Sequence, residues 1–187
     1  VYCSCRCSVG RGLERVMSLS DLHQNILQPF VDETLTCLVD MASMSAYADE
    51  AERESLDQFK FHGFAVAVKT HGSLNGYILM HHYFETALAI GNQVRQALLG
   101  ISETESKIEE PIIEALEEFS NTAIGLATRH LAEEDHGIQF EPPFFLVAPQ
   151  DLSKLMQGVV DIITVPVHIE NVGRFYLNYL LQEKAGD

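Results

Sequence analysis

The sequence has no tryptophan, few basic residues, and no run of apolar residues that is long enough to cross a bilayer. A membrane-spanning helix needs roughly 20 consecutive apolar residues, so no membrane span is predicted. The N-terminus also lacks the apolar core of a signal peptide, and we therefore expect a cytoplasmic protein. Lys and Arg number 12 against 27 Asp and Glu, which gives a formal net charge of -15. This balance excludes a basic surface, so neither nucleic acid nor an anionic membrane is an expected partner.

Cysteine is scarce and unevenly placed. Cys3, Cys5 and Cys7 crowd the start of the chain, and Cys37 stands alone in an apolar segment. Zinc sites usually combine two separated pairs of ligands, so the Cys-x-Cys-x-Cys pattern does not favour a metal site. We expect Cys37 to behave as a small buried hydrophobic residue.

The length of 187 residues fits one domain, and 47% hydrophobic residues are enough for a sizeable core. Residues 1–16 show no periodic apolar face, and Met17 opens a segment that runs into a helix. We therefore expect residues 1–16 to be a non-native or disordered extension, and residues 17–187 to form a single domain. An intact mass of the native protein that includes Val1–Val16 would contradict this prediction.

Apolar periodicity predicts three helices, with Pro29 marking a break or a second start in the first: 20–44, 84–99 and 112–133. Alternating β-rich segments predict two hairpins, 63–70 with 74–82 and 161–169 with 174–181, and Pro166 implies an edge or a bulge in the second. We further expect a short strand at 144–147, a helical turn at 152–159, and a linker or irregular element at 46–60. The two hairpins, each preceded by a long helix, predict an α/β (α+β) fold of two pseudo-repeated αββ-like halves that share one sheet.

The third helix carries the most informative positions. Glu118 and Asn121 are three residues apart, and Gly125 follows four residues later. Positions three or four apart share one face of a helix, so these residues and Glu114 should form one stripe. Gly costs a helix about 1 kcal/mol relative to Ala, and Asn is also a mediocre helix former, which indicates that the stripe has another role. An amide can orient a water, a carboxylate can hold a cation, and a missing side chain lets another surface approach.

The segment Glu118-Phe119-Ser120-Asn121, followed by Gly125, occurs together with further ordered segments at 62–68, 74–78 and 85–90. This set resembles the CheC/CheX-type chemotaxis phosphatases, specifically the CheX-like branch. The first segment is similar to the Glu-x-x-Asn helix of that family and its trailing glycine, and the others are similar to its first hairpin and the helix that follows. The likeness spans about residues 20–181 in order and spacing.

The resemblance implies a central, mostly antiparallel sheet flanked by long helices, and an enzyme that hydrolyses the aspartyl phosphate of a CheY-like response-regulator receiver domain. It implies that Asn121 aligns the attacking water, that Glu118 engages the active-site lysine of the receiver, and that Gly125 and Glu114 contact the partner. No metal is expected on this chain, whereas Mg²⁺ is expected on the receiver. A homodimer is also implied. The corresponding first helix offers Glu33-Thr34-Leu35-Thr36, with Thr where Asn would be needed, so we expect one site.

Other interpretations remain open from the residues themselves. Glu118 and Asn121 could be an ordinary solvated carboxylate and a locally hydrogen-bonded amide. His81 and His82 with Glu85 suggest a metal site, but neighbouring strand residues point to opposite faces, which leaves too few ligands. The main functional alternative is a non-catalytic module of the same fold that binds a receiver or another signalling protein.

Overall fold

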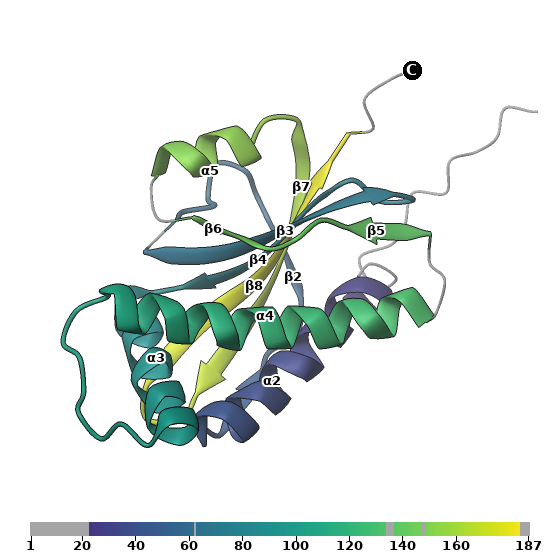
Figure 1. Cartoon of the computed structure of the whole chain (residues 1–187). Helices are drawn as coiled ribbons and strands as arrows, with labels where there is room; N and C mark the ends of the chain where they lie inside the picture. The colour runs from purple at the N-terminus through teal and green to yellow at the C-terminus, as the bar shows by residue number, and fades with distance from the viewer. Residues whose placement is uncertain (1–22, 62, 134–136, 147–148, 184–187) are drawn as a thin grey trace, which may run out of the picture.

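The computed structural model describes residues 23–61, 63–133, 137–146 and 149–183. Its main feature is one antiparallel sheet with the strand order β1-β7-β8-β4-β3-β5, to which β2 adds on β7 and β6 adds on β3. Helices α2, α3 and α4 lie together on one face of the sheet, and the shorter α5 lies on the other (Figure 1). The predicted mixed fold with an antiparallel sheet is confirmed. The proposed extension at 1–16 lies outside the described residues.

Two long hairpins form the centre of the sheet. The first joins β3 (Phe64–Gly72) to β4 (Gly76–His82), and the second joins β7 (Val159–Ile169) to β8 (Gly173–Gln182). They meet where β4 pairs antiparallel with β8. Both hairpins were predicted, because their alternating apolar and β-branched residues are a strong local signal.

Four strands of three residues each cover the outer edges of these hairpins. β1 (Ala46–Ala48) and β2 (Glu52–Glu54) pair with β7, and β5 (Ile138–Phe140) and β6 (Phe144–Leu146) pair with β3. The prediction of a linker or irregular element at 46–60 was therefore wrong for β1 and β2. Strands of three residues, such as Glu-Arg-Glu in β2, are too short to show a periodic pattern. They form because their backbones pair with β7.

Pro166 lies where the cover of β7 is interrupted. The pairing with β2 reaches Thr164 and the pairing with β1 starts at Val167, while the carbonyl of Pro166 accepts the backbone N–H of Asp49. A proline, which has no N–H, fits such a gap. Pro166, predicted to mark an edge or a bulge, thus lies at a gap between the pairings of β7 with β1 and with β2. The register shift of β7 is at a different place, between Val159 and Asp161.

All three predicted helices are present, and α3 has the predicted bounds, whereas the predicted start of the first helix at residue 20 lies outside the described residues. A π-helical turn, η1 (His23–Leu27), leads into α2 (Gln28–Ala42), and Pro29 lies in the first turn of α2, which confirms the second start. The helix α3 (Phe84–Leu99) ends at Gly100, whose φ of 67° is the left-handed conformation that glycine adopts readily. The longest helix, α4 (Glu110–Glu133), packs against both α2 and α3.

The main core lies between these three helices and the sheet. It contains large buried side chains from each layer, among them Phe30, Phe119, Phe175 and Tyr179, and Cys37 is also buried in it, as predicted. A smaller core on the other face includes Leu155 of α5 (Pro149–Leu155) together with Leu79, Ile162 and Leu180. None of the helices in the described part of the chain combines the length and apolarity that a membrane crossing requires.

Candidate functional site

The exposed face of α4 carries the stripe that the sequence singled out. Glu114, Glu118, Asn121 and Gly125 are all exposed, one above the other along the helix. The opposite face of α4 is buried against the core through a separate set of apolar residues: Ile112, Leu116, Phe119, Ala123, Ala127 and Leu131. The helix thus presents a carboxylate and a carboxamide to the surroundings from a rigid support.

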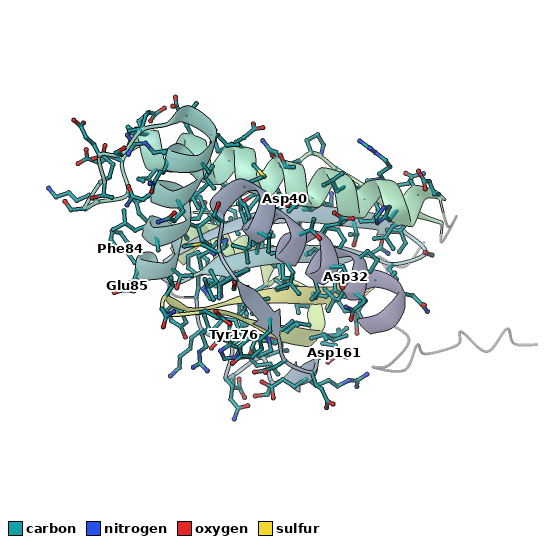
Figure 2. All side chains as sticks on the ribbon, turned by 90° about the horizontal axis from the view of Figure 1, so that it is seen from below. Asp32, Asp40, Phe84, Glu85, Asp161 and Tyr176 are labelled. Carbon is teal, nitrogen blue, oxygen red and sulfur yellow. The ribbon has the colours of Figure 1, made fainter. Side chains whose placement is uncertain are left out.

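Contacts with β4 and with α3 hold α4 in place. Phe119 is completely buried, and the neighbouring Ser120 directs its hydroxyl toward the sulfur of Met80 on β4 at 3.8 Å. A methyl group at Gly91 of α3 would lie 2.7 Å from Cγ2 of Ile112, so α3 comes close to α4 only because Gly91 has no side chain. Figure 2 shows α4 running across the helix layer beside α2 and α3. Such packing limits how far the exposed stripe can move relative to the sheet.

Glu118 and Asn121 are available to an external partner. Among the described residues, none forms a hydrogen bond or ion pair with either side chain. The glycine one turn further along is equally open, because a methyl group at Gly125 would meet no atom of the described residues within 4 Å. Packing within the described part of the chain therefore does not require glycine at this position, although it does at Gly91.

Two hollows flank the stripe. One, of about 360 Å³, lies between the end of α3 and the start of α4, and Glu114 and Glu118 line it together with apolar residues such as Leu98 and Leu99. Leu98 is 50% exposed at the rim of this hollow.

The other hollow, of about 440 Å³, lies beside Asn121 and Gly125. Its far wall is the segment between β5 and β6, Glu141-Pro142-Pro143. Glu141 accepts a hydrogen bond from Lys69 Nζ at 2.9 Å, and Nδ1 of His71 lies 3.5 Å from the same oxygen. The hydrogen bond and charge of Lys69 lower the pKa of Glu141, and the same contact raises the pKa of Lys69. Apart from the extended conformation that its prolines favour, no local pattern predicts this wall.

The hollow at the end of α3 depends on a contact between Arg95 and Glu105 that was not predicted. Arg95, which is buried, donates a hydrogen bond to Glu105 at 3.1 Å, and the backbone of Glu105 exchanges two hydrogen bonds with the side chain of Asn92. These contacts hold the connector between α3 and α4 against α3. Nothing in the acidic composition of this connector indicates which carboxylate meets Arg95.

The corresponding positions on α2 are already engaged. Glu33 lies 3.2 Å from Nδ1 of His130 on α4, and the hydroxyl of Thr36 donates to the backbone carbonyl of Asp32 at 2.9 Å. Thr34 between them is completely buried. The Glu-x-x-Thr segment thus offers neither a free carboxylate nor an amide, in contrast to α4.

The two adjacent histidines lie on opposite faces of the sheet, as expected. His81 stacks on Phe61 on the side away from the long helices, and His82 packs against Phe175 in the main core. Burial lowers the pKa of His82 to about 3, with a smaller contribution from His81, so the ring is neutral. No cluster of three or more His, Cys, Asp or Glu side chains suited to a metal occurs within the described residues.

The comparisons with known proteins agree with this architecture. Over residues 64–162, slightly more than half of the chain, the sequence matches the family described as chemotaxis phosphatase CheX. Among proteins with curated descriptions, none matches the sequence significantly.

Several solved structures share the fold. The CheX protein from Desulfovibrio desulfuricans is 20% identical, with a TM-score of 0.63 over 83% of this chain and 97% of that chain. A CheC-like superfamily protein from Shewanella sp. PV-4 is 16% identical, with a TM-score of 0.65 over 89% and 100%. A CheX solved in a CheX-CheY-BeF3-Mg²⁺ complex from Borrelia burgdorferi is 23% identical, with a TM-score of 0.60 over 84% and 97%. The matched family and the shared fold together establish that this chain belongs to the CheX family of chemotaxis phosphatases.

Proposed function

We propose that this chain hydrolyses the aspartyl phosphate of a CheY-like response-regulator receiver domain. The observation that carries the proposal is the exposed pair on α4, Glu118 and Asn121, which has no partner within the described chain and lies beside an open Gly125. Membership of a phosphatase family and the fold shared with a CheX that was solved with CheY support the choice of reaction and partner.

The reaction needs little covalent chemistry from this chain. A water attacks phosphorus, the bond between phosphorus and the aspartyl oxygen breaks, and inorganic phosphate and a free carboxylate leave. Because phosphoryl transfer depends mainly on positioning and charge, an amide that holds the water in line is sufficient. Asn121 can both donate to and accept from that water.

In this proposal Glu118 fixes the docking by engaging the active-site lysine of the receiver, and Mg²⁺ stays on the receiver. Gly125 lets the receiver backbone approach α4, and Glu114 adds a contact at the periphery. The two hollows beside the stripe give room for receiver loops on either side of the helix. The receiver substrate also implies a cytoplasmic location.

The direct test follows the decay of a phosphorylated CheY-like receiver from the same organism with and without this protein. Asn121→Ala and Glu118→Ala should each slow the accelerated decay by about 100-fold, because each removes a positioned group from the transition state. Glu133→Ala, which removes an exposed carboxylate at the far end of α4, serves as the matched control and should leave the rate unchanged. Removing Mg²⁺ from the receiver should abolish the acceleration.

The outcomes separate the main alternatives. Binding of a receiver without acceleration, for several receivers, would favour a non-catalytic module. Acceleration that survives both substitutions would show that the catalytic residues are misassigned. The homodimer stays a separate prediction, which light scattering on the purified chain would test.

A further inference from the structure

A polar hollow lies on the face of the sheet away from α4. Its floor consists of side chains from three central strands, Thr164, Asn178, Tyr176 and His81, which the strand register places in adjacent rows. β2 and the segment after it, up to Lys60, form the wall. The volume is about 340 Å³, within the range of small-molecule sites. Tyr176 alternates along β8 with Phe175 and Leu177, which belong to the main core, so its side chain is on the opposite face of the sheet from α4.

A chain of hydrogen bonds with a fixed direction crosses this floor. The hydroxyl of Thr164 donates to Oε2 of Glu54 at 2.8 Å, since a carboxylate can only accept. Thr164 has a single proton, so its oxygen must accept from Nδ2 of Asn178, also at 2.8 Å. Glu54 therefore determines the orientation of the Asn178 amide.

The amide oxygen of Asn178 is left with its hydrogen-bonding capacity unused. Asn178 is 1% exposed, and its Oδ1 has no hydrogen-bond partner among the described residues. Among the described side chains that line this hollow, only Asn178 has a buried polar atom without a hydrogen-bond partner. A buried acceptor without a partner costs about 1–3 kcal/mol, so a group that supplies a donor here would be favoured.

The remaining lining favours a positive charge on that donor. Glu52 and Glu54 contribute two carboxylates, whereas the guanidinium of Arg53 is engaged at 3.4 Å by Asp161, which is not part of the lining. Lys60 is exposed at the rim. Three aromatic rings, of Phe59, Tyr83 and Tyr176, complete the walls and can take a cation on their faces. The ring of Tyr176 already holds the guanidinium of Arg174 at 5.5 Å from its centroid.

We propose that this hollow binds a small organic cation that carries N–H groups, such as a primary amine or an amidinium. The cation donates to the carboxylate of Glu54 and to the amide oxygen of Asn178, and its carbon skeleton packs against the aromatic rings. The site lies on the far side of the sheet from Glu118 and Asn121, so it is distinct from the proposed phosphatase site and independent of it.

The test is calorimetric titration of the full chain with two probes, benzamidine hydrochloride and butylammonium chloride. Benzoate and benzyl alcohol, which lack the cationic donor, are the matched controls. We expect saturable binding of at least one cation and of neither control. Glu54→Gln, which keeps the shape but removes the charge, should weaken binding about tenfold or more. Glu50→Gln, on the exposed turn between β1 and β2 outside the lining, should leave binding unchanged.

Two further variants locate the site. Thr164→Val removes the hydroxyl that orients Asn178 and should also weaken binding, whereas Asn121→Ala, on the other face, should not. Unfolding curves verify that each variant is folded before titration. The proposal is overturned if neither cation binds saturably to the wild-type chain, if benzoate binds as well as benzamidinium, or if Glu54→Gln leaves the affinity unchanged.

Discussion

A methyl group at Gly91 would lie 2.7 Å from Cγ2 of Ile112, whereas one at Gly125 would have no neighbour within 4 Å among the residues that the structure describes. Both glycines lie in long helices, but only Gly91 is required by packing within the described chain. Gly91→Ala should therefore destabilise the protein by about 1–3 kcal/mol, because overpacking displaces α3 from α4. Chemical denaturation with urea measures this change, and an unaltered midpoint would contradict the close packing.

Gly125→Ala should have the opposite effect on stability and a separate effect on function. Alanine is the better helix former, so the free energy of unfolding should rise by up to about 1 kcal/mol. The same methyl group stands where the receiver backbone is proposed to approach, so the acceleration of receiver dephosphorylation should fall. A variant that is more stable and equally active would rule out a close approach at this position.

The ion pair between Arg95 and Glu105 should contribute to stability because Arg95 is only 7% exposed. Glu105→Gln leaves the buried guanidinium without its counter-charge and should cost about 2 kcal/mol. Glu103→Gln removes an exposed carboxylate from the same connector and should cost almost nothing. Equal unfolding midpoints for the two variants would show that the pair has no structural role.

His82 should make the protein sensitive to mild acid. Burial, and to a smaller extent His81, lowers its pKa from 6.5 to about 3 in the folded state. Below pH 6.5 the unfolded chain gains a proton at this ring that the folded chain does not take up, so the free energy of unfolding should fall by about 1.4 kcal/mol per pH unit toward pH 3.

His82→Phe removes this contribution and also removes two ring nitrogens that have no partner among the described residues. Urea unfolding at pH 7 and pH 5 measures both effects. Between these values the wild type should lose about 2 kcal/mol more than the variant. Parallel losses would show that the ring is protonated in the folded state.

The net charge of -15 should affect association with the proposed receiver partner. The phosphorylation pocket of a receiver is acidic, so like charges slow the encounter at low ionic strength. Because salt screens charges beyond about 10 Å at 0.1 M, the value of kcat/KM should rise as salt increases from a few millimolar. A steep fall with salt would instead indicate that attraction to a basic partner surface drives docking.

Local patterns were enough to predict the parts of the fold that carry their own signals. The period of α4 placed Glu118, Asn121 and Gly125 on one face, and the alternation in β3, β4, β7 and β8 identified both hairpins. The short strands β1, β2 and β5 were not predicted, since three residues contain no period and their conformation depends on partners far away in the chain.

The surroundings of the candidate site were less predictable for the same reason. The wall formed by Pro142 and Pro143 faces Asn121 only because the neighbouring strands β5 and β6 pair with β3. Likewise, the hollow beside Glu118 depends on Arg95, whose role follows from its meeting Glu105 and not from its residue type. The sequence indicates which side chains are exposed, but long-range pairing determines what surrounds them.

The four short strands at the sheet edges have a consequence for solubility during folding and storage. A long, continuous strand edge offers a row of unpaired backbone groups to which other chains can add, and this is a common route to aggregation. Here β1 with β2 and β5 with β6 divide each outer edge into two brief segments. A growing fibril would find only three-residue templates along these segments, and one of them, Glu52–Glu54, is fully charged.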